Sequence, residues 1–361
     1  MGDKIRIGII GTGGIAGAHI RAYQKMSDVE VIACSDIIPG KAANFIHQFG
    51  IEGARAFEVN ADLLSLDLDG VSVCTPNAAH REVAVEAMQA GKHVLTEKPM
   101  SVTLDEAVDM VRVSKRTGKL LSVGFQPRYD PNMQLVKEIV QSGELGNVYY
   151  VQTGGGRRRG IPGGTFINKE SAGAGALADI GCYSLDLALN SLGYPKPLTV
   201  SAYSSNFFGT NPKYYEFADQ FQVEDFGVAL IRLEGGIALN FKLSWAMHMD
   251  SLGPTVFLGT DAGLRLTPAG SGPWSGVWDG GVGSITVFHD LLGRQTQSPI
   301  DVVKHNVDIF YEKVRAFVLA IKDGLPAPIP GEQIVRNQAI IDGIIRSSEL
   351  GREVEISIPE L

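Results

Sequence analysis

The sequence has few cysteines, no long apolar run and no excess of positive charge, and each shortage excludes a class of protein. Only three cysteines occur among 361 residues, without a CxxC pair or a histidine-rich tract, which argues against a disulfide framework and a metal site. The formal net charge of −8 opposes binding to nucleic acid or to an anionic membrane surface. No segment approaches the roughly 20 apolar residues of a membrane span, and the N-terminus lacks a signal-peptide core. We therefore expect a cytoplasmic protein that binds no metal, membrane or nucleic acid.

What the sequence does contain predicts two globular domains. With 361 residues, 44% of them hydrophobic, the chain exceeds one ordinary hydrophobic core. In residues 1–125, short apolar strand patterns alternate with helical ones, which predicts an α/β domain with a doubly wound parallel sheet. Residues 126–361 contain mostly strand patterns and few helices, and they are expected to form the second domain.

The first strand pattern runs into a glycine cluster that opens a helix. Gly11, Gly13 and Ala16 match G-x-G-x-x-G/A, in which the backbone turns tightly and approaches a pyrophosphate at the helix N-terminus. The second strand ends at Asp36, whose carboxylate suits a ribose 2′-hydroxyl. Apolar residues, not Arg or Ser, follow Asp36, so a 2′-phosphate would meet no obvious cation. The pattern predicts NAD as the cofactor in preference to NADP.

Two later strands end in short polar segments. The segment "TPN" follows one strand, and "EKP" follows the next. Ligands of a doubly wound sheet bind beyond the carboxyl ends of its strands, so both segments are candidates for the site. A lone loop lysine is usually solvated, but Lys98 at a strand end, between Glu97 and Pro99, is a candidate functional group.

Several segments together resemble the Gfo/Idh/MocA oxidoreductases, namely "GIIGTGGIAGAHI", "CTPNAAH", "VLTEKPM", "GFQPRYDP", "GGGRRRG", "GALADIGCYSLDLAL" and "SSELGREVEI". The resemblance covers essentially the whole chain. It implies a Rossmann domain followed by an α/β domain with a large open, mostly antiparallel sheet. It also implies NAD(P)-linked oxidation of a sugar, polyol or related carbinol, with Lys98, Asp179 and Tyr183 as catalytic residues.

This resemblance, with the strand-end positions, gives the expected binding residues. For the cofactor they are Gly11, Thr12, Gly13, Gly14, Ile15, Asp36, Thr75, Pro76, Asn77, His80, Glu97, Lys98 and Gln126. For the substrate they are Lys98, Arg128, Arg157, Asp179 and Tyr183. Two departures count against inositol as the substrate: Tyr183 stands where many inositol dehydrogenase-like sequences have His, and Pro127 where they commonly have Arg.

The segment 175–192 reads as an apolar helix with one polar stripe. At about 100° per residue, Tyr183, Asp186 and Asn190 lie within ~20° to 40° of Asp179, and apolar residues fill most of the remaining circumference. Such a stripe faces either an internal cleft or a satisfied polar network. For Asp186 both interpretations stay open: a site residue, or a buried carboxylate with a structural partner.

The second domain is expected to need helices on its sheet. Only the helix at 175–192 and two near the C-terminus, within 304–324 and 331–351, are available as covers. If they cover one face, the other is left to associate, so we expect a homodimer or homotetramer through the open sheet. The alternative is that loops shield this face.

Two further segments have both a functional and a structural interpretation. Arg157 to Arg159 follow a strand, where they either grip a carboxylate or phosphate of the substrate or form a solvated surface run. Trp274 and Trp278 lie in a glycine-rich segment as either a sugar-stacking lid or a hairpin tip.

The leading functional hypothesis is an NAD-dependent sugar or polyol dehydrogenase. Lys98 and Tyr183 are expected to transfer the hydroxyl proton, Asp179 to orient the substrate, and the identity of the base is open. One alternative is a glycoside hydrolase that uses bound NAD for transient oxidation followed by elimination. Another is a non-catalytic nucleotide-binding regulator, against which the joint presence of Lys98, Asp179 and Tyr183 argues.

Overall fold

The computed structural model describes residues 4–268, 282–302 and 306–361, so Trp274 and Trp278 lie outside the described residues. The chain forms two compact units. Unit 1 comprises Met1–Phe125, Asp308–Val335 and Pro359–Leu361, and unit 2 comprises Gln126–Val307 and Arg336–Ile358. Within the described ranges, no helix combines the length and the apolarity that crossing a membrane requires.

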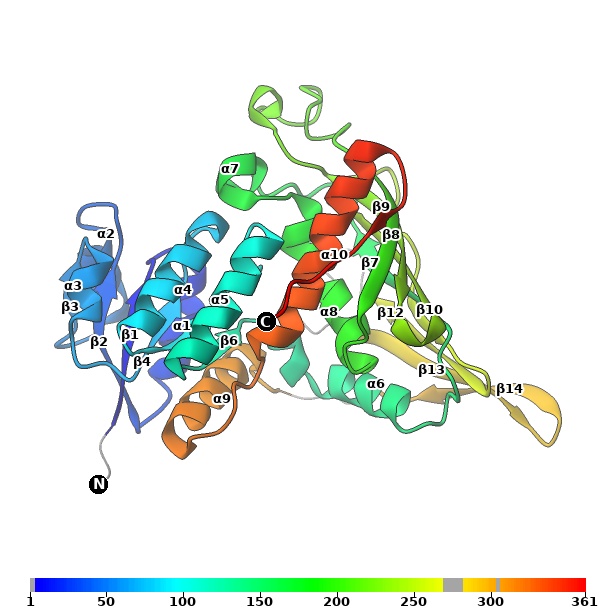
Figure 1. Ribbon diagram of the computed structural model, residues 1–361, viewed down its shortest axis with the longest axis horizontal. Coiled ribbons are helices and arrows are strands. Elements are labelled where there is room, and N and C mark those ends of the chain that lie inside the picture. Colours follow the sequence, from blue (N-terminus) through cyan, green and yellow to red (C-terminus); the bar gives the residue numbers. More distant parts are fainter. Residues whose placement is uncertain (1–3, 269–281, 303–305) are drawn as a thin grey trace. The chain divides into compact units, whose positions relative to one another are not determined.

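Unit 1 contains a six-stranded parallel sheet with the order β3-β2-β1-β4-β5-β6 (Figure 1). This arrangement confirms the predicted doubly wound fold, and the strand order reverses between β1 and β4, where ligands of such sheets bind. The strands are β1 (Ile5–Ile10), β2 (Val29–Ser35), β3 (Arg55–Phe57), β4 (Gly70–Val73), β5 (His93–Thr96) and β6 (Leu121–Val123).

Helices connect these strands in the order expected of βα units. Because β4 and β6 are buried along their whole length, their sequences are continuous apolar or small-residue runs without alternation. Thr103 caps α5 by accepting from the backbone of Glu106, and the left-handed Gly118 ends it. The helices are α1 (Gly14–Tyr23), α2 (Lys41–Phe49), α3 (Asn60–Leu64), α4 (His80–Gln89) and α5 (Leu104–Thr117).

Helix α9 (Ile309–Asp323) belongs to unit 1, and the expectation that it covers the second sheet was wrong. Its apolar stripe, with Val314, Phe317 and Val318, is buried in the same core cluster as Ile20 of α1. The expected domain boundary near residue 126 coincides with the first boundary between the units. The segment 126–361, however, is divided between them because α9 buries its apolar face in unit 1.

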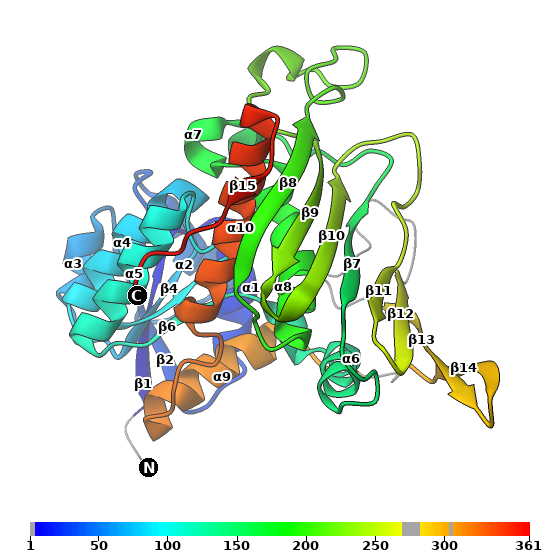
Figure 2. The same cartoon turned by 45° about the vertical axis from the view of Figure 1, so that its right-hand side comes forward.

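Unit 2 contains a nine-stranded sheet with the order β14-β13-β12-β11-β7-β10-β9-β8-β15 (Figure 2). All neighbours are antiparallel except β7 and β10, which confirms the large, mostly antiparallel sheet. The strands are β7 (Tyr150–Gly156), β8 (Pro197–Ser205), β9 (Phe226–Leu233), β10 (Ile237–Ser244), β11 (Thr255–Leu258), β12 (Ala262–Pro268), β13 (Val282–Leu291), β14 (Arg294–Ile300) and β15 (Val354–Glu355).

Helices cover one face of this sheet. Helix α8 (Cys182–Ser191) lies on β7, where Thr153 donates to the carbonyl of Ser184 at 3.3 Å. Helix α10 (Gly331–Leu350) packs on β8, and Ser347 accepts from the backbone of Ala202 at 2.9 Å. Helix α6 (Pro131–Gln141) lies against α8. The short helix α7 (Lys169–Ala172) precedes α8 in the sequence.

The parallel pair β7 and β10 depends on one glycine. Gly154 has φ +136°, and a Cβ atom there would lie 1.7 Å from the carbonyl oxygen of Lys242. We expect Gly154→Ala to destabilise the protein by at least ~2 kcal/mol in urea unfolding, because the alanine combines backbone strain with a steric clash. Gly155→Ala is the matched control, since its Cβ would meet nothing within 4 Å, and its effect should stay within about 1 kcal/mol. Equal losses in both variants would contradict this account.

Candidate active site

The turn after β1 has the shape of a pyrophosphate cradle. Gly11 has φ +86°, and a Cβ atom there would lie 2.7 Å from the backbone of Cys74. A Cβ atom at Gly13 or Gly14 would meet nothing within 4 Å, so open space borders the start of α1. No side chain caps α1 at Gly13, which leaves first-turn N–H groups to an anion. These features fit a dinucleotide, and the backbone of Gly11, Gly13 and Gly14 would hold its phosphates.

Asp36 at the end of β2 is an ionised acceptor. Its Oδ2 atom accepts from the backbone N and Oγ1 of Thr12 at 2.9 and 2.8 Å. Lys41 Nζ lies 2.8 Å from the same oxygen. Burial raises the pKa of Asp36, but the hydrogen bonds from Lys41 and Thr12 outweigh this and hold it below the ordinary value. The expectation of no cation near Asp36 was wrong, because α2 brings Lys41 to it.

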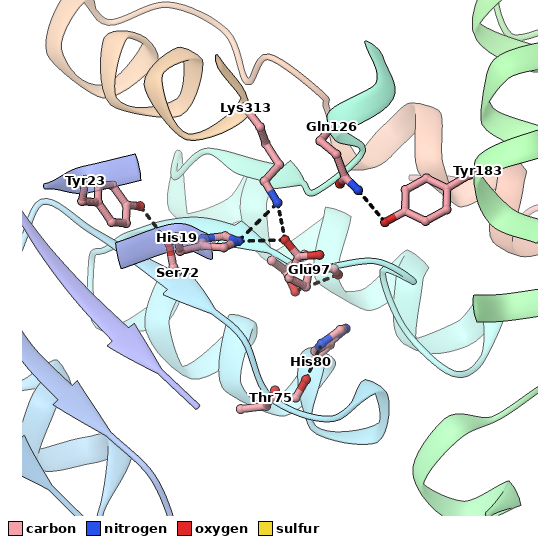
Figure 3. Close-up of polar contacts among 10 residues, drawn as sticks. His19, Tyr23, Ser72, Thr75, His80, Glu97, Gln126, Tyr183 and Lys313 are labelled. Carbon is pink, nitrogen blue, oxygen red and sulfur yellow. Dashed lines mark hydrogen bonds and ion pairs between the residues drawn. The ribbon is translucent and has the colours of Figure 1, made fainter. Parts of the chain in front are cut away.

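His80 links the two polar strand-end segments. Its Nδ1 atom lies 2.7 Å from the carbonyl oxygen of Pro99. Its Nε2 atom lies 3.0 Å from the carbonyl oxygen of Thr75 (Figure 3). The ring is buried, and burial lowers the pKa of His80 although both carbonyls oppose this. His80 was expected to bind the cofactor. Its contacts support an indirect role, in which the ring holds the segments that contain Thr75 and Lys98.

A buried polar cluster surrounds the carboxylate of Glu97. Glu97 Oε1 is bonded to Lys313 Nζ and lies 2.8 Å from His19 Nε2 (Figure 3). On the other side of the ring, His19 Nδ1 lies 3.0 Å from Ser72 Oγ, which lies 2.8 Å from the hydroxyl of Tyr23. Burial raises the pKa of Glu97, but the ammonium of Lys313 and the hydrogen bond with His19 hold it well below its usual range.

The sequence analysis missed His19 and Lys313. Both lie on apolar helix faces, and Lys313 stands four residues from both Ile309 and Phe317 on the buried stripe of α9. A lysine inside an apolar stripe is rarely buried without a partner, so this spacing was the available signal.

In unit 2, Asp179 lies in a π-helical turn, Leu177–Gly181, directly before α8. Its Oδ2 atom accepts from Trp245 Nε1 at 3.0 Å. Tyr183, on the first turn of α8, accepts a hydrogen bond from Gln126 Nε2 at 2.9 Å (Figure 3). Gln126 was expected to bind the cofactor, and its side chain holds Tyr183. Short π-helical turns such as Leu177–Gly181 frequently occur at functional sites.

Asp186 has a structural partner, which decides between its two interpretations. Arg128 donates from Nε and Nη2 to the two carboxylate oxygens of Asp186, at 2.9 and 2.8 Å. Tyr194 contacts both side chains. Arg128 was expected to bind the substrate. That stays a prediction, and its paired donors to Asp186 tie the turn before α6 to α8.

The run of three arginines does not act as a unit. Arg157 is buried, and burial lowers its pKa, while Asp179 and then Tyr215 favour its charged form. Arg158 is exposed and donates to Asp250 at 2.6 Å. Neither Arg157 nor Arg158 is an uncompensated cation, because Arg157 interacts with the carboxylate of Asp179 and Arg158 with that of Asp250.

Arg159 holds an aromatic loop, residues 206–221. Its guanidinium carbon lies 4.6 and 4.5 Å from the ring centroids of Phe208 and Tyr214. Asp225 anchors the same loop by accepting from the backbone of Phe208 at 2.8 Å. Tyr215 stacks on Phe217 at 5.1 Å, and its buried hydroxyl has no hydrogen-bond partner within the described ranges.

Within residues 4–268, 282–302 and 306–361, no group of three or more His, Cys, Asp or Glu side chains could hold a metal ion. Unit 1 offers a phosphate cradle, an ionised carboxylate and Lys98. Unit 2 offers Asp179 and Tyr183.

Comparison with known proteins identifies the family to which the chain belongs. Residues 5–125 match the oxidoreductase family with an NAD-binding Rossmann fold, and residues 133–265 match the GFO/IDH/MocA C-terminal domain. The chain is 34% identical to D-glucoside 3-dehydrogenase of Escherichia coli, over 74% of this chain and 78% of that protein. It is 33% identical to glucose-6-phosphate 3-dehydrogenase of Bacillus subtilis, over 50% and 52% of the two chains.

Among solved structures, levoglucosan dehydrogenase in complex with NADH and levoglucosan has the same fold. Its TM-score is 0.82 at 20% identity, and the match covers 99% of this chain and 100% of that one. The two matched domains and the extended similarity to a dehydrogenase identify the chain as a member of the Gfo/Idh/MocA family of oxidoreductases.

Proposed function

We propose that the protein is an NAD-linked dehydrogenase that interconverts the CH–OH group of a neutral sugar or glycoside with the ketone. The observation that carries this proposal is the joint presence of Lys98 directly after β5 and of Asp179 and Tyr183 at the head of α8. Lys98 lies in the bend after β5, and Asp179 and Tyr183 lie on helical turns, in a chain of this oxidoreductase family. The similarity to a glucoside dehydrogenase supports a sugar as the substrate.

A bound nicotinamide supplies the hydride acceptor. The protein must then take the hydroxyl proton, and a tyrosine with an ordinary pKa of about 10 is a poor base at neutral pH. We assign the proton transfer to Lys98 and Tyr183, because a nearby ammonium favours the phenolate. Gln126 donates to the Tyr183 oxygen, which also favours the phenolate. Asp179, oriented by Trp245, is assigned to the substrate hydroxyl.

The preference for a neutral substrate follows from the arginine run. Asp179 offsets the charge of Arg157, Asp250 pairs with Arg158, and aromatic rings enclose Arg159. A carboxylate or phosphate would therefore find no uncompensated guanidinium in this run. Tyr215 has a buried hydroxyl that suits a sugar hydroxyl. Its phenol interacts electrostatically with the guanidinium of Arg157.

Asp36 supports NAD as the preferred cofactor. Its ionised carboxylate suits the ribose hydroxyls, and it would repel a 2′-phosphate. Lys41 offsets part of that repulsion, so we expect NADP to be used weakly.

The three cysteines are buried thiols, which supports a reducing, cytoplasmic location.

We also propose a homodimer or homotetramer through the open face of the unit 2 sheet. On this face Leu230 lies opposite Ser201 and Asn240, and Asn240 lies opposite Gln152. Leu230 is 43% exposed, and Tyr203 and Leu258 are exposed as well. Such a broad, partly apolar sheet face supports self-association.

A substrate panel tests the reaction class. With NAD, we expect methyl glucosides and neutral aldoses to give kcat/KM at least ~10-fold above glucose 6-phosphate and glucuronate, because binding leaves no charge unpaired. NADP should give a lower kcat/KM than NAD. The measurement is NADH absorbance under initial-rate conditions. Aglycone release without net NADH would identify a hydrolase, and a preference for the charged sugars would contradict the charge argument.

Single-turnover kinetics test the proton-transfer assignment. Lys98→Ala should lower the rate of NADH formation at least ~100-fold while NAD binding, followed by fluorescence, changes little. Tyr183→Phe should cost less than Lys98→Ala if Lys98 is the base, and at least as much if Tyr183 is. An unchanged rate in Lys98→Ala would sink the assignment.

Sedimentation velocity tests the assembly. Leu230→Lys should shift the oligomer to monomer, because it places a charge in the middle of the proposed interface. Leu325→Lys is the control, since it also changes an exposed leucine but lies in unit 1, outside the sheet. A monomeric wild-type protein, or dissociation by both variants alike, would overturn the proposal.

A further inference from the structure

We propose that Tyr215 determines substrate specificity through a hydrogen bond between its hydroxyl group and one hydroxyl group of the sugar, and that the aromatic loop 206–221 holds it for this contact. The inference deepens the proposed function and rests on it for the class of ligand. The contacts that carry it lie within unit 2.

The first step is the place of the aromatic loop on the sheet. Strands β8, β9, β10 and β7 lie side by side (Figure 2). Their register aligns four residues at one end of the strands, namely Ser205, Phe226, Ser244 and Gly156. The aromatic loop connects β8 to β9 at this end. Trp245, which donates to Asp179, follows β10 at the same end, so the loop and this aspartate share one end of the sheet.

The second step is a direct attachment of the loop to the turn that contains Asp179. Glu224, three residues after the loop, accepts two hydrogen bonds from the segment around the start of this turn. Its carbonyl oxygen accepts from the backbone N of Ala176 at 3.1 Å, and its Oε1 atom accepts from that of Leu177 at 3.0 Å. The next residue, Asp225, accepts from backbone N–H groups at the start of the loop. Residues 224 and 225 therefore join the aromatic loop to the turn of Asp179.

The third step is the placement of Tyr215 within the loop. Its ring stacks on Phe217, and Phe217 stacks on Phe221 with 6.5 Å between the ring centroids. Its phenol interacts electrostatically with the buried guanidinium of Arg157, and so does the carboxylate of Asp179. The stack fixes the ring of Tyr215, and the shared interaction with Arg157 relates its hydroxyl group to Asp179.

Packing does not account for the hydroxyl group of Tyr215. Its oxygen is buried, and in the part of the chain that the structure describes it has no hydrogen-bond partner. Leaving a buried hydroxyl unpaired costs free energy, and a phenylalanine would keep the ring stack without that cost. A sugar hydroxyl both donates and accepts, so it satisfies the phenol in either role. A sugar that lacks this hydroxyl leaves the phenol unpaired and is bound more weakly.

Unfolding in urea separates a ligand-binding hydroxyl group from a structural one. In the ligand-free protein, Tyr215→Phe should leave the urea midpoint unchanged or raise it, because the variant removes a polar atom that is unpaired. Tyr149→Phe is the matched control, since Tyr149 is an exposed tyrosine of the same unit at the opposite end of β7. A lower midpoint in Tyr215→Phe, with sugar selectivity unchanged, would assign the hydroxyl to the fold and overturn the inference.

Isothermal titration calorimetry of the full-length protein, saturated with NADH, measures sugar binding without turnover. The probes are methyl β-D-glucopyranoside and its 2-, 3-, 4- and 6-deoxy analogues. The wild-type protein should bind one deoxy analogue at least ~10-fold more weakly than the parent sugar. Tyr215→Phe should bind the parent sugar more weakly by a similar factor and should no longer distinguish it from that analogue. Tyr149→Phe should match the wild type.

The remaining outcomes separate this inference from the proposed function. If Tyr215→Phe binds the parent sugar as tightly as the wild type, or loses the same factor for every analogue, the inference is overturned, and NADH formation from the sugar would leave the proposed function intact. A wild-type protein that binds none of the probes also overturns it. Selectivity that depends on Tyr215, in a protein that forms no NADH from any neutral sugar, would support the role of Tyr215 and contradict the proposed function.

Discussion

The ion pair between Glu97 and Lys313 is the constraint on which much of unit 1 depends. Burying two charges is costly, and their attraction offsets this only when geometry and hydrogen bonding are good. Here His19 completes the carboxylate, Ser72 fixes His19, and β6 closes the space behind it. The pair therefore accepts one arrangement of β5, α1 and α9, and it recruits α9 from the far end of the chain.

Unit 2 follows the same principle around Asp179 and Tyr183. Each polar group near them has a partner from another element: Trp245 for Asp179 and Gln126 for Tyr183, with Arg128 holding Asp186 behind. A site whose charges are compensated before substrate arrives is suited to neutral ligands. Under the proposed function, discrimination would come from hydrogen bonds to hydroxyl groups, because a substrate that leaves a buried partner unpaired is penalised.

The sequence predicted what local patterns determine. The glycine turn at Gly11, the alternation of strands and helices, and the strand-end position of Lys98 all follow from neighbours within a few residues. The placement of α9 did not follow, because periodicity reveals an apolar face and not the surface it covers. His19 and Lys313 were missed for a related reason: each contacts Glu97, which lies 78 residues from His19 and 216 residues from Lys313 in the sequence. A helical projection at 100° per residue assumes a regular α-helix, so it did not predict the π-helical turn at Asp179.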